Sequence, residues 1–125
     1  MDIESVGKEV VDAAVMVHRE LGVGLLESVY EIVLEYELGN RGLRVQRQVP
    51  VRISYQGKEF PEAFRIDILV EEMVVLELKS VEGVSRAHFK QTLTYLRLAD
   101  KRLGFLLNFG APTMKEGITR IVNKL

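Results

Sequence analysis

The spacing of the hydrophobic residues changes along the chain, and this change constrains the fold more than any other feature. Within residues 5–21 and 26–40, apolar side chains recur every three or four positions, which predicts two helices. Three later runs, at residues 45–55, 64–70 and 74–79, alternate apolar side chains with other, mostly polar ones, which predicts strands. Glycines follow both helical segments and provide the backbone freedom with which helices commonly end.

The last third of the chain adds a helix and two strands. Residues 85–99 have helical spacing, with Ser85 as a suitable N-cap, and the apolar run at 103–109 suits a buried strand. A last short strand is predicted at 118–122. The order α-α-β-β-β-α-β-β predicts an α/β fold with a mixed sheet, in one domain over residues 1–125. The helix between the third and fourth strands would form a right-handed crossover, which makes those two strands parallel.

Composition excludes several classes of protein. The 17 basic residues nearly balance the 18 acidic ones, so the chain does not coat nucleic acid by bulk positive charge. Cysteine is absent, which excludes disulfide scaffolds, thiol nucleophiles and zinc fingers, and two histidines are too few for a histidine-rich metal site. No G-x-G-x-x-G follows a predicted strand, so a dinucleotide fingerprint is missing.

The N-terminal residues lack the basic and apolar regions of a signal peptide. The apolar stretch at residues 13–17 is too short to cross a bilayer. We therefore expect a soluble, cytoplasmic protein that has no contact with a membrane.

Asp67, Glu77 and Lys79 are the residues that best indicate chemistry. The runs at 64–70 and 74–79 predict a hairpin with one buried face that turns at Glu71 and Glu72. Side chains alternate along a strand, so Glu77 and Lys79 share a face. Asp67 is expected on the face opposite Ile66 and Ile68.

In that register Asp67 lies across from Glu77, with Cβ atoms about 4.5–5.5 Å apart. Two carboxylates and a substrate phosphate would suit Mg²⁺, while Lys79 would stabilise phosphate charge or help to deprotonate a metal-bound water. The alternative is an exposed hairpin with a cross-strand charge ladder and no catalytic function.

Other polar residues have both a structural and a functional interpretation. Glu27 opens the second helix, where it either complements the helix dipole or delivers a third acidic ligand to the edge of the sheet. Gln91 and Tyr95 form a stripe with His88 on the third helix, which is either solvated or faces the strand of Glu77. His18, near the end of the first helix, is interpreted as structural. Two leucines of the third helix, Leu93 and Leu96, are expected to supply packing.

Residues 24–30 (GLLESVY) have the pattern G-x-x-E-x-x-Y, and the chain resembles the GxxExxY family of the PD-(D/E)xK nuclease superfamily. The resemblance covers nearly the whole chain. It includes residues 17–22 (VHRELG), 65–71 (RIDILVE), 77–79 (ELK), 88–95 (HFKQTLTY) and 104–110 (GFLLNFG). It implies a restriction-endonuclease-like α-β-β-β-α-β core, a mixed central sheet flanked by helices.

The resemblance also implies a role for each matching position. Asp67 and Glu77 would be metal ligands, Lys79 the charge-stabilising lysine, and Glu27 an auxiliary acidic ligand from the preceding helix. Gln91 and Tyr95 are similar to the Q-x-x-x-Y helix motif of RecB-like nucleases, which borders the active site. The superfamily's proline before the aspartate is Ile66 in this chain.

These features together predict a nuclease that depends on Mg²⁺ or Mn²⁺ and hydrolyses phosphodiesters by in-line attack of metal-activated water. The expected partner is nucleic acid, DNA rather than RNA, and a homodimer would suit cutting of two strands. The alternative is an inactive module of the same fold that binds nucleic acid or a protein. Basic side chains beside the first strand and on the third helix are candidate contacts to the nucleic-acid backbone: Arg41, Arg44, Arg47, Arg52, Arg86, Lys90 and Arg97.

Overall fold

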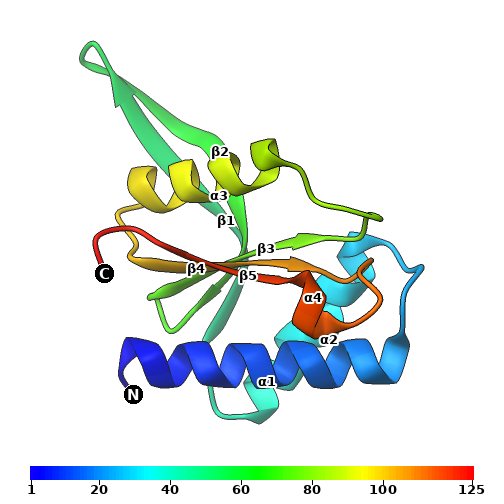
Figure 1. Cartoon of the computed structure of the whole chain (residues 1–125). Helices are drawn as coiled ribbons and strands as arrows, with labels where there is room; N and C mark the ends of the chain where they lie inside the picture. Colours follow the sequence, from blue (N-terminus) through cyan, green and yellow to red (C-terminus); the bar gives the residue numbers. More distant parts are fainter.

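A computed structural model describes all residues from 1 to 125 and has the predicted order of elements (Figure 1). The only addition is one short helix, α4, which precedes the last strand. In chain order the elements are α1 (Ile3–Leu21), α2 (Glu27–Asn40), β1 (Val45–Tyr55), β2 (Lys58–Val70), β3 (Val74–Lys79), α3 (Arg86–Leu98), β4 (Leu103–Asn108), α4 (Met114–Gly117) and β5 (Ile118–Val122).

The five strands form one mixed sheet in the order β1-β2-β3-β4-β5. β3 and β4 are parallel and are joined through α3, as the crossover interpretation predicted, and the other neighbouring pairs are antiparallel. Helices α1 and α2 cover one face of the sheet, whereas α3 lies on the other (Figure 1). The predicted α/β fold with a mixed, helix-flanked sheet is therefore confirmed.

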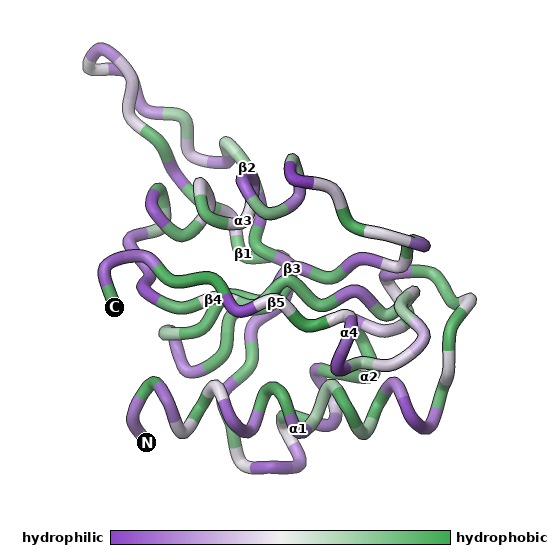
Figure 2. Tube along the Cα trace, in the orientation of Figure 1, coloured by the Kyte–Doolittle hydropathy of each residue, from purple (hydrophilic) through white to green (hydrophobic).

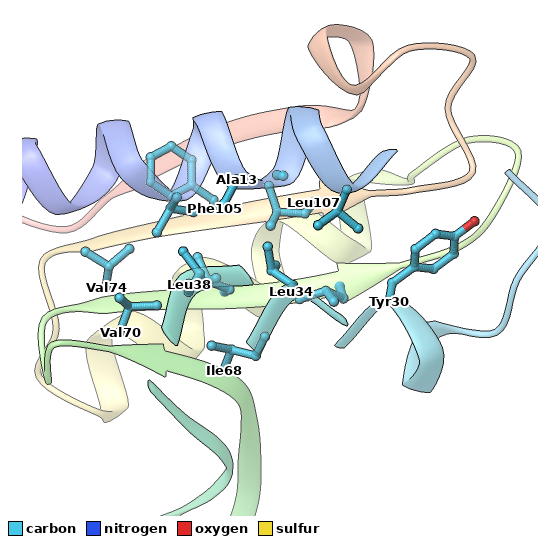
Figure 3. Close-up of a cluster of buried hydrophobic side chains, with 14 of the residues drawn as sticks. Ala13, Tyr30, Leu34, Leu38, Ile68, Val70, Val74, Phe105 and Leu107 are labelled. Atoms are coloured by element: carbon cyan, nitrogen blue, oxygen red, sulfur yellow. The ribbon is translucent and has the colours of Figure 1, made fainter. Parts of the chain in front are cut away.

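The hydrophobic core has two parts, one on each face of the sheet. The larger part joins α1 and α2 to the sheet and includes Leu34, Leu38, Ile68 and Leu107 (Figure 3). The smaller part joins Leu96 of α3 to β1, β2 and β3. Hydrophobic residues follow the strands between the helical layers, while the tip of the β1–β2 hairpin is hydrophilic (Figure 2). None of the helices combines the length and apolarity that a membrane crossing requires.

The prediction of one buried face for the β2–β3 hairpin is wrong. Leu76 packs under α1 and α2, while its neighbour Val75 packs under α3, so β3 is buried on both faces. The alternating sequence pattern did not predict the burial of both faces of β3, because the second face is covered by the crossover helix α3. Ile66 and Ile68 also do not share a face, since they pack in the smaller and the larger part of the core respectively. β2 thus changes faces around Asp67.

Two further differences concern local chain geometry. β2 begins at Lys58, six residues before the predicted Phe64, and pairs with β1 to form a projecting arm (Figure 1). Gln56 and Gly57 both have positive φ, 50° and 80°, as in the tight turns that match the twist of a hairpin. Leu93 was expected to pack, but 38% of its surface is exposed, and Leu96 alone of the two is buried.

Candidate active site

Asp67 and Glu77 lie next to each other on β2 and β3. The pairing of Ile68 with Leu76 places Asp67 beside Glu77 in the continuing register. The backbone N–H of Asp67 faces Glu77 Oε1 at 3.4 Å, and the N–H of Leu78 donates to Asp67 Oδ2 at 2.9 Å. Each carboxyl group is therefore held by the backbone of the other strand.

The Glu77 side chain is buried, with 4% of its surface exposed. Burial, followed by the neighbouring Asp67 carboxylate, raises the pKa of Glu77 to about 9. A side-chain hydrogen bond to Asp67 acts in the same direction, while the positive charge of Lys79 opposes the rise. The protein alone therefore favours one proton on this acidic pair at neutral pH.

Lys79 ends β3, on the same face as Glu77, and its side chain is partly buried. Its backbone is fixed by β4, because Lys79 pairs with Asn108 and its carbonyl accepts a hydrogen bond from the Phe109 N–H at 2.8 Å. Lys79 lies two residues after Glu77 on β3, so the two side chains leave the strand on the same face.

Glu27 reaches this end of β3 from the first turn of α2. Its Oε2 accepts a hydrogen bond from the N–H of Ser80 at 3.1 Å, and the Ser80 hydroxyl donates to the carbonyl of Leu25 at 2.7 Å. The start of α2 is thereby tied to the residue that follows Lys79.

Tyr30, the last residue of the G-x-x-E-x-x-Y pattern, anchors the loop before α2. It is fully buried and stacks on Phe109 with ring centroids 4.5 Å apart. Its hydroxyl donates to the carbonyl of Gly22 and accepts from the N–H of Leu25. Tyr30 therefore positions Glu27 indirectly.

Helix α3 brings Tyr95 to the other side of the acidic pair. Tyr95 stacks on Phe64 of β2, with centroids 3.9 Å apart. Burial, and then the charges of Glu77 and Asp67, raise the pKa of Tyr95. Gln91 lies one turn earlier on α3 and is exposed, whereas His88 accepts a hydrogen bond from the Ser85 N–H and caps the helix.

An open cleft of about 640 Å³ lies between the start of α2, the residue that follows β3, the first part of β1 and the last part of β2. Asp67 and Glu27 both line it. The other lining residues are Leu25, Leu26, Ser28, Glu31, Arg47, Gln48 and Ser80.

A family model described as the PD-(D/E)XK nuclease superfamily matches residues 4–121, nearly the whole chain. The chain belongs to the PD-(D/E)XK nuclease superfamily. No curated protein and no solved structure gives a match. The superfamily's restriction-endonuclease-like fold agrees with the mixed sheet and its flanking helices.

The chain carries Asp67 followed by the run Glu77-Leu78-Lys79, the order of an acid and then acid, x and lysine that the superfamily's name spells. Ile66 replaces the proline before the aspartate, and its side chain packs in the smaller part of the core. The replacement leaves both acidic groups in place.

The donor chemistry of the acidic pair Asp67 and Glu77 fits a hard divalent cation. Mg²⁺ is commonly held by one or two carboxylates together with waters and substrate phosphates. The raised pKa of Glu77 means that the two carboxyl groups resist ionising together without added positive charge. No group of three or more His, Asp or Glu side chains is arranged to hold a metal ion, and Glu27 is bonded to Ser80 N–H instead.

Several basic residues named as candidate contacts are engaged within the protein. Arg41 binds Glu9, Asp12 and Glu37 and has a side chain only 15% exposed, so it does not offer a free charge to nucleic acid. Arg44 and Arg52 make longer ion pairs, to Glu71 at 3.8 Å and Glu59 at 4.0 Å. Arg86, Lys90 and Arg97 are exposed on α3. His18 is structural, as expected, because its buried ring bonds the carbonyl of Ala111.

Sequence reasoning missed Glu31 and Gln48, and it gave no special position to Arg47. Glu31 is buried in the wall of the cleft and binds both Arg47 and Gln48. Its spacing, one helical turn after Glu27, is the only sequence signal that links it to the site. Gln48 carried no signal, because its importance depends on the positive φ of its backbone within β1.

Proposed function

We propose that this chain is a metal-dependent phosphodiesterase that cleaves nucleic acid, DNA in preference to RNA, in the cytoplasm. The observation that carries the proposal is the contact between Asp67 and Glu77, with Lys79 two residues further along the same strand. Membership of the PD-(D/E)XK nuclease superfamily supports a nuclease-type activity.

In this proposal Asp67 and Glu77 hold Mg²⁺ or Mn²⁺, with Glu27 as an auxiliary acid across the cleft. The cation supplies Lewis-acid activation of water and neutralises charge on the phosphate. Backbone hydrogen bonds from Asp67 and Leu78 fix the two carboxyl groups before substrate arrives, so little reorganisation is needed.

Lys79 acts on the substrate and not on the cation. Its ammonium group neutralises the non-bridging phosphoryl oxygens, which gain charge in the transition state. Tyr95 borders the acidic pair on the α3 side, where it limits access of water, and Gln91 lies beside it as a contact to the nucleic-acid strand.

The decisive experiment is a cleavage panel of labelled single- and double-stranded DNA and RNA with Mg²⁺ or Mn²⁺. We expect Lys79→Ala to lower cleavage by at least about 100-fold while metal affinity, measured by calorimetry, stays nearly unchanged. Glu77→Ala should reduce both, and Gln91→Ala should have a milder effect on cleavage.

Equal cleavage by Lys79→Ala and the wild type would remove the proposed mechanism. If the wild-type chain binds neither metal ion, even with an oligonucleotide present, the enzyme hypothesis fails. The alternative, an inactive module that binds nucleic acid or a protein, would then be favoured.

A further inference from the structure

Glu31 is a buried acid for which the proposed reaction has no use. Only 5% of its surface is exposed, yet both of its oxygens have a partner. Oε2 accepts a hydrogen bond from Arg47 Nε at 2.9 Å, and Oε1 accepts one from Gln48 Nε2 at 2.9 Å. A buried carboxylate is costly unless it is paired, so this arrangement fixes the side chains of Arg47 and Gln48.

Arg47 is the only basic residue among those that line the cleft. Glu31 occupies its Nε, Glu35 lies 3.7 Å from its Nη1, and 31% of the side chain is exposed. A guanidinium group has five N–H donors in a planar fork. Donors therefore remain for a ligand in the cleft, and the fork suits a phosphate.

The position of Gln48 places the guanidinium group of Arg47 beside the acidic pair of Asp67 and Glu77. The regular pairing of β1 with β2 omits Gln48, which lies opposite Asp67 between the pairs Arg47–Ile68 and Val49–Ile66. Its φ of 53° is in the left-handed region, which is unfavourable for a residue other than glycine. The irregular backbone directs Gln48 toward Glu31 and keeps Arg47 at the same edge of the cleft as Asp67.

We propose that Arg47, held by Glu31 and Gln48, binds a phosphodiester group of the nucleic-acid strand. This group is the neighbour, along the same strand, of the phosphodiester that is cleaved. This inference rests on the proposed function. Arg47 provides a permanent positive charge in a cleft whose other charged residues, Glu27, Glu31 and Asp67, are acidic. It acts as a binding residue and takes no part in bond cleavage.

The test measures binding of a labelled oligonucleotide in a Lys79→Ala background with Mg²⁺, in which the strand stays intact. Glu31→Gln and Arg47→Gln are introduced together, because Arg47→Gln alone would leave a buried carboxylate unpaired. The matched control is the double variant Glu4→Gln/Arg120→Gln, which removes another carboxylate–arginine pair away from the cleft.

We expect the Glu31/Arg47 double variant to bind about 10- to 100-fold more weakly, as for the loss of one charged hydrogen-bonding group. The slope of log affinity against log salt should fall by about 0.7–0.9, which corresponds to one phosphate contact. The Glu4/Arg120 variant should match its parent. Unchanged affinity and slope in the Glu31/Arg47 variant would overturn this inference alone, whereas a parent that binds no nucleic acid would overturn the proposed function as well.

A different observation concerns the outer face of α2. Leu34 and Leu38 fill the core from one side of this helix, whereas the opposite side carries exposed apolar side chains. The exposed fractions there are high: Val29 38%, Ile32 52% and Tyr36 70%. Exposed apolar side chains gathered on one side of a helix mark a surface suited to contact with a partner.

We infer that this face, formed by Val29, Ile32 and Tyr36, is the contact surface for a second copy of the chain. These three exposed apolar side chains lie at spacings of three and four residues on one helix, so they can form the apolar centre of an interface. The acids beside them are neutralised, since Glu31 and Glu35 lie near Arg47, and Glu37 binds Arg41. Two copies of α2 can therefore pack in antiparallel fashion about Ile32 without repulsion between like charges.

The test is the mass of the chain in solution, measured by sedimentation over a wide range of concentration. We expect a dimer, which Ile32→Glu converts to a monomer. Tyr55→Glu, a change at another exposed apolar residue, should leave the dimer intact. A wild-type chain that stays monomeric, or an Ile32→Glu variant that stays dimeric, would contradict the assignment.

Discussion

At the scale of single residues, Glu77 combines burial with an acidic neighbour. Removing a carboxyl group from water favours its neutral form, and the charge of Asp67 adds to the effect. The pKa of Glu77 in the folded chain, about 9, therefore lies well above the value of 4.5 that an unperturbed glutamate has. This difference couples the stability of the fold to pH.

Between pH 4.5 and about 9, the folded chain keeps a proton on Glu77 that the unfolded chain has released. The free energy of unfolding contributed by this group therefore falls as pH rises through that window. Glu77→Gln removes the titration and keeps a neutral side chain. In metal-free solution at pH 7 we expect it to stabilise the chain by about 1–3 kcal/mol, measured by urea unfolding.

The pH dependence separates this effect from a change in packing. The difference between Glu77→Gln and the wild type should shrink toward zero below pH 4.5, where both the folded and the unfolded wild type carry the proton. Glu82→Gln, a change at an exposed glutamate, is the control and should leave the free energy of unfolding unchanged at every pH. A stabilisation that is the same at pH 4 and pH 7 would contradict the electrostatic explanation.

Metal binding should reverse the protonation of Glu77. A ligand carboxyl group must lose its proton, so Mg²⁺ binding at pH 7 should release close to one proton per site. Affinity should rise up to about tenfold per pH unit and level off near pH 9. Calorimetry in two buffers with different ionisation enthalpies measures the release directly, and an affinity independent of pH would exclude Glu77 as a ligand.

The position of the acidic pair could be predicted from sequence because strands alternate with a period of two and the turn at Glu71 and Glu72 fixes the register. The burial of Glu77 could not, since it depends on how α3, the element that follows β3, packs back onto the sheet. Gln48 was missed for a related reason. A positive φ at a glutamine has no signature in composition or spacing.

At the scale of elements, α2 and β3 meet through a small set of hydrogen bonds. Tyr30 holds the loop that precedes α2, and Glu27 and Ser80 connect the first turn of that helix to the end of β3. The N-cap position is Leu26, whose side chain offers no capping bond, so the helix start depends on these tertiary contacts.

Tyr30→Phe tests this dependence. It removes the hydroxyl that bonds the carbonyl of Gly22 and the N–H of Leu25 but preserves the stacking on Phe109. We expect a loss of about 1–2 kcal/mol in stability and a fall in cleavage that exceeds the effect on metal affinity, because Glu27 loses its anchored position. Tyr55→Phe, at an exposed tyrosine near the tip of the β1–β2 arm, is the matched control and should match the wild type in both assays.

The order of the elements was predictable because each helix and strand has its own hydrophobic period, and the fold class follows from that order. The extension of β2 back to Lys58 was not predictable from sequence. Residues 58–63 are exposed on both faces and therefore lack the apolar alternation of a half-buried strand. The four-residue helix α4 was also missed, because a single turn is too short to show a period.

At the scale of the whole molecule, the centre of the sheet is covered by helices on both faces, whereas the β1–β2 arm is exposed to solvent. β3 and β4 are buried along nearly their full length and lie between helical layers (Figure 1). The outer part of the arm, residues 52–62, pairs only within itself and is mostly exposed. Local opening of the arm therefore breaks few contacts, while opening of β3 requires loss of both parts of the core.

Amide hydrogen exchange should reveal this gradient. We expect the amides of β3 and β4 to exchange only through global unfolding, with a free energy equal to that from urea unfolding, and those at residues 53–60 to exchange many-fold faster. Adding Mg²⁺ should slow exchange in β3 without slowing it at the arm tip, since the acidic pair lies at the junction of β2 and β3 and not in the arm. Equal protection of the arm tip and β3 would contradict this picture, because a free two-stranded ribbon has no third strand or helix to protect it.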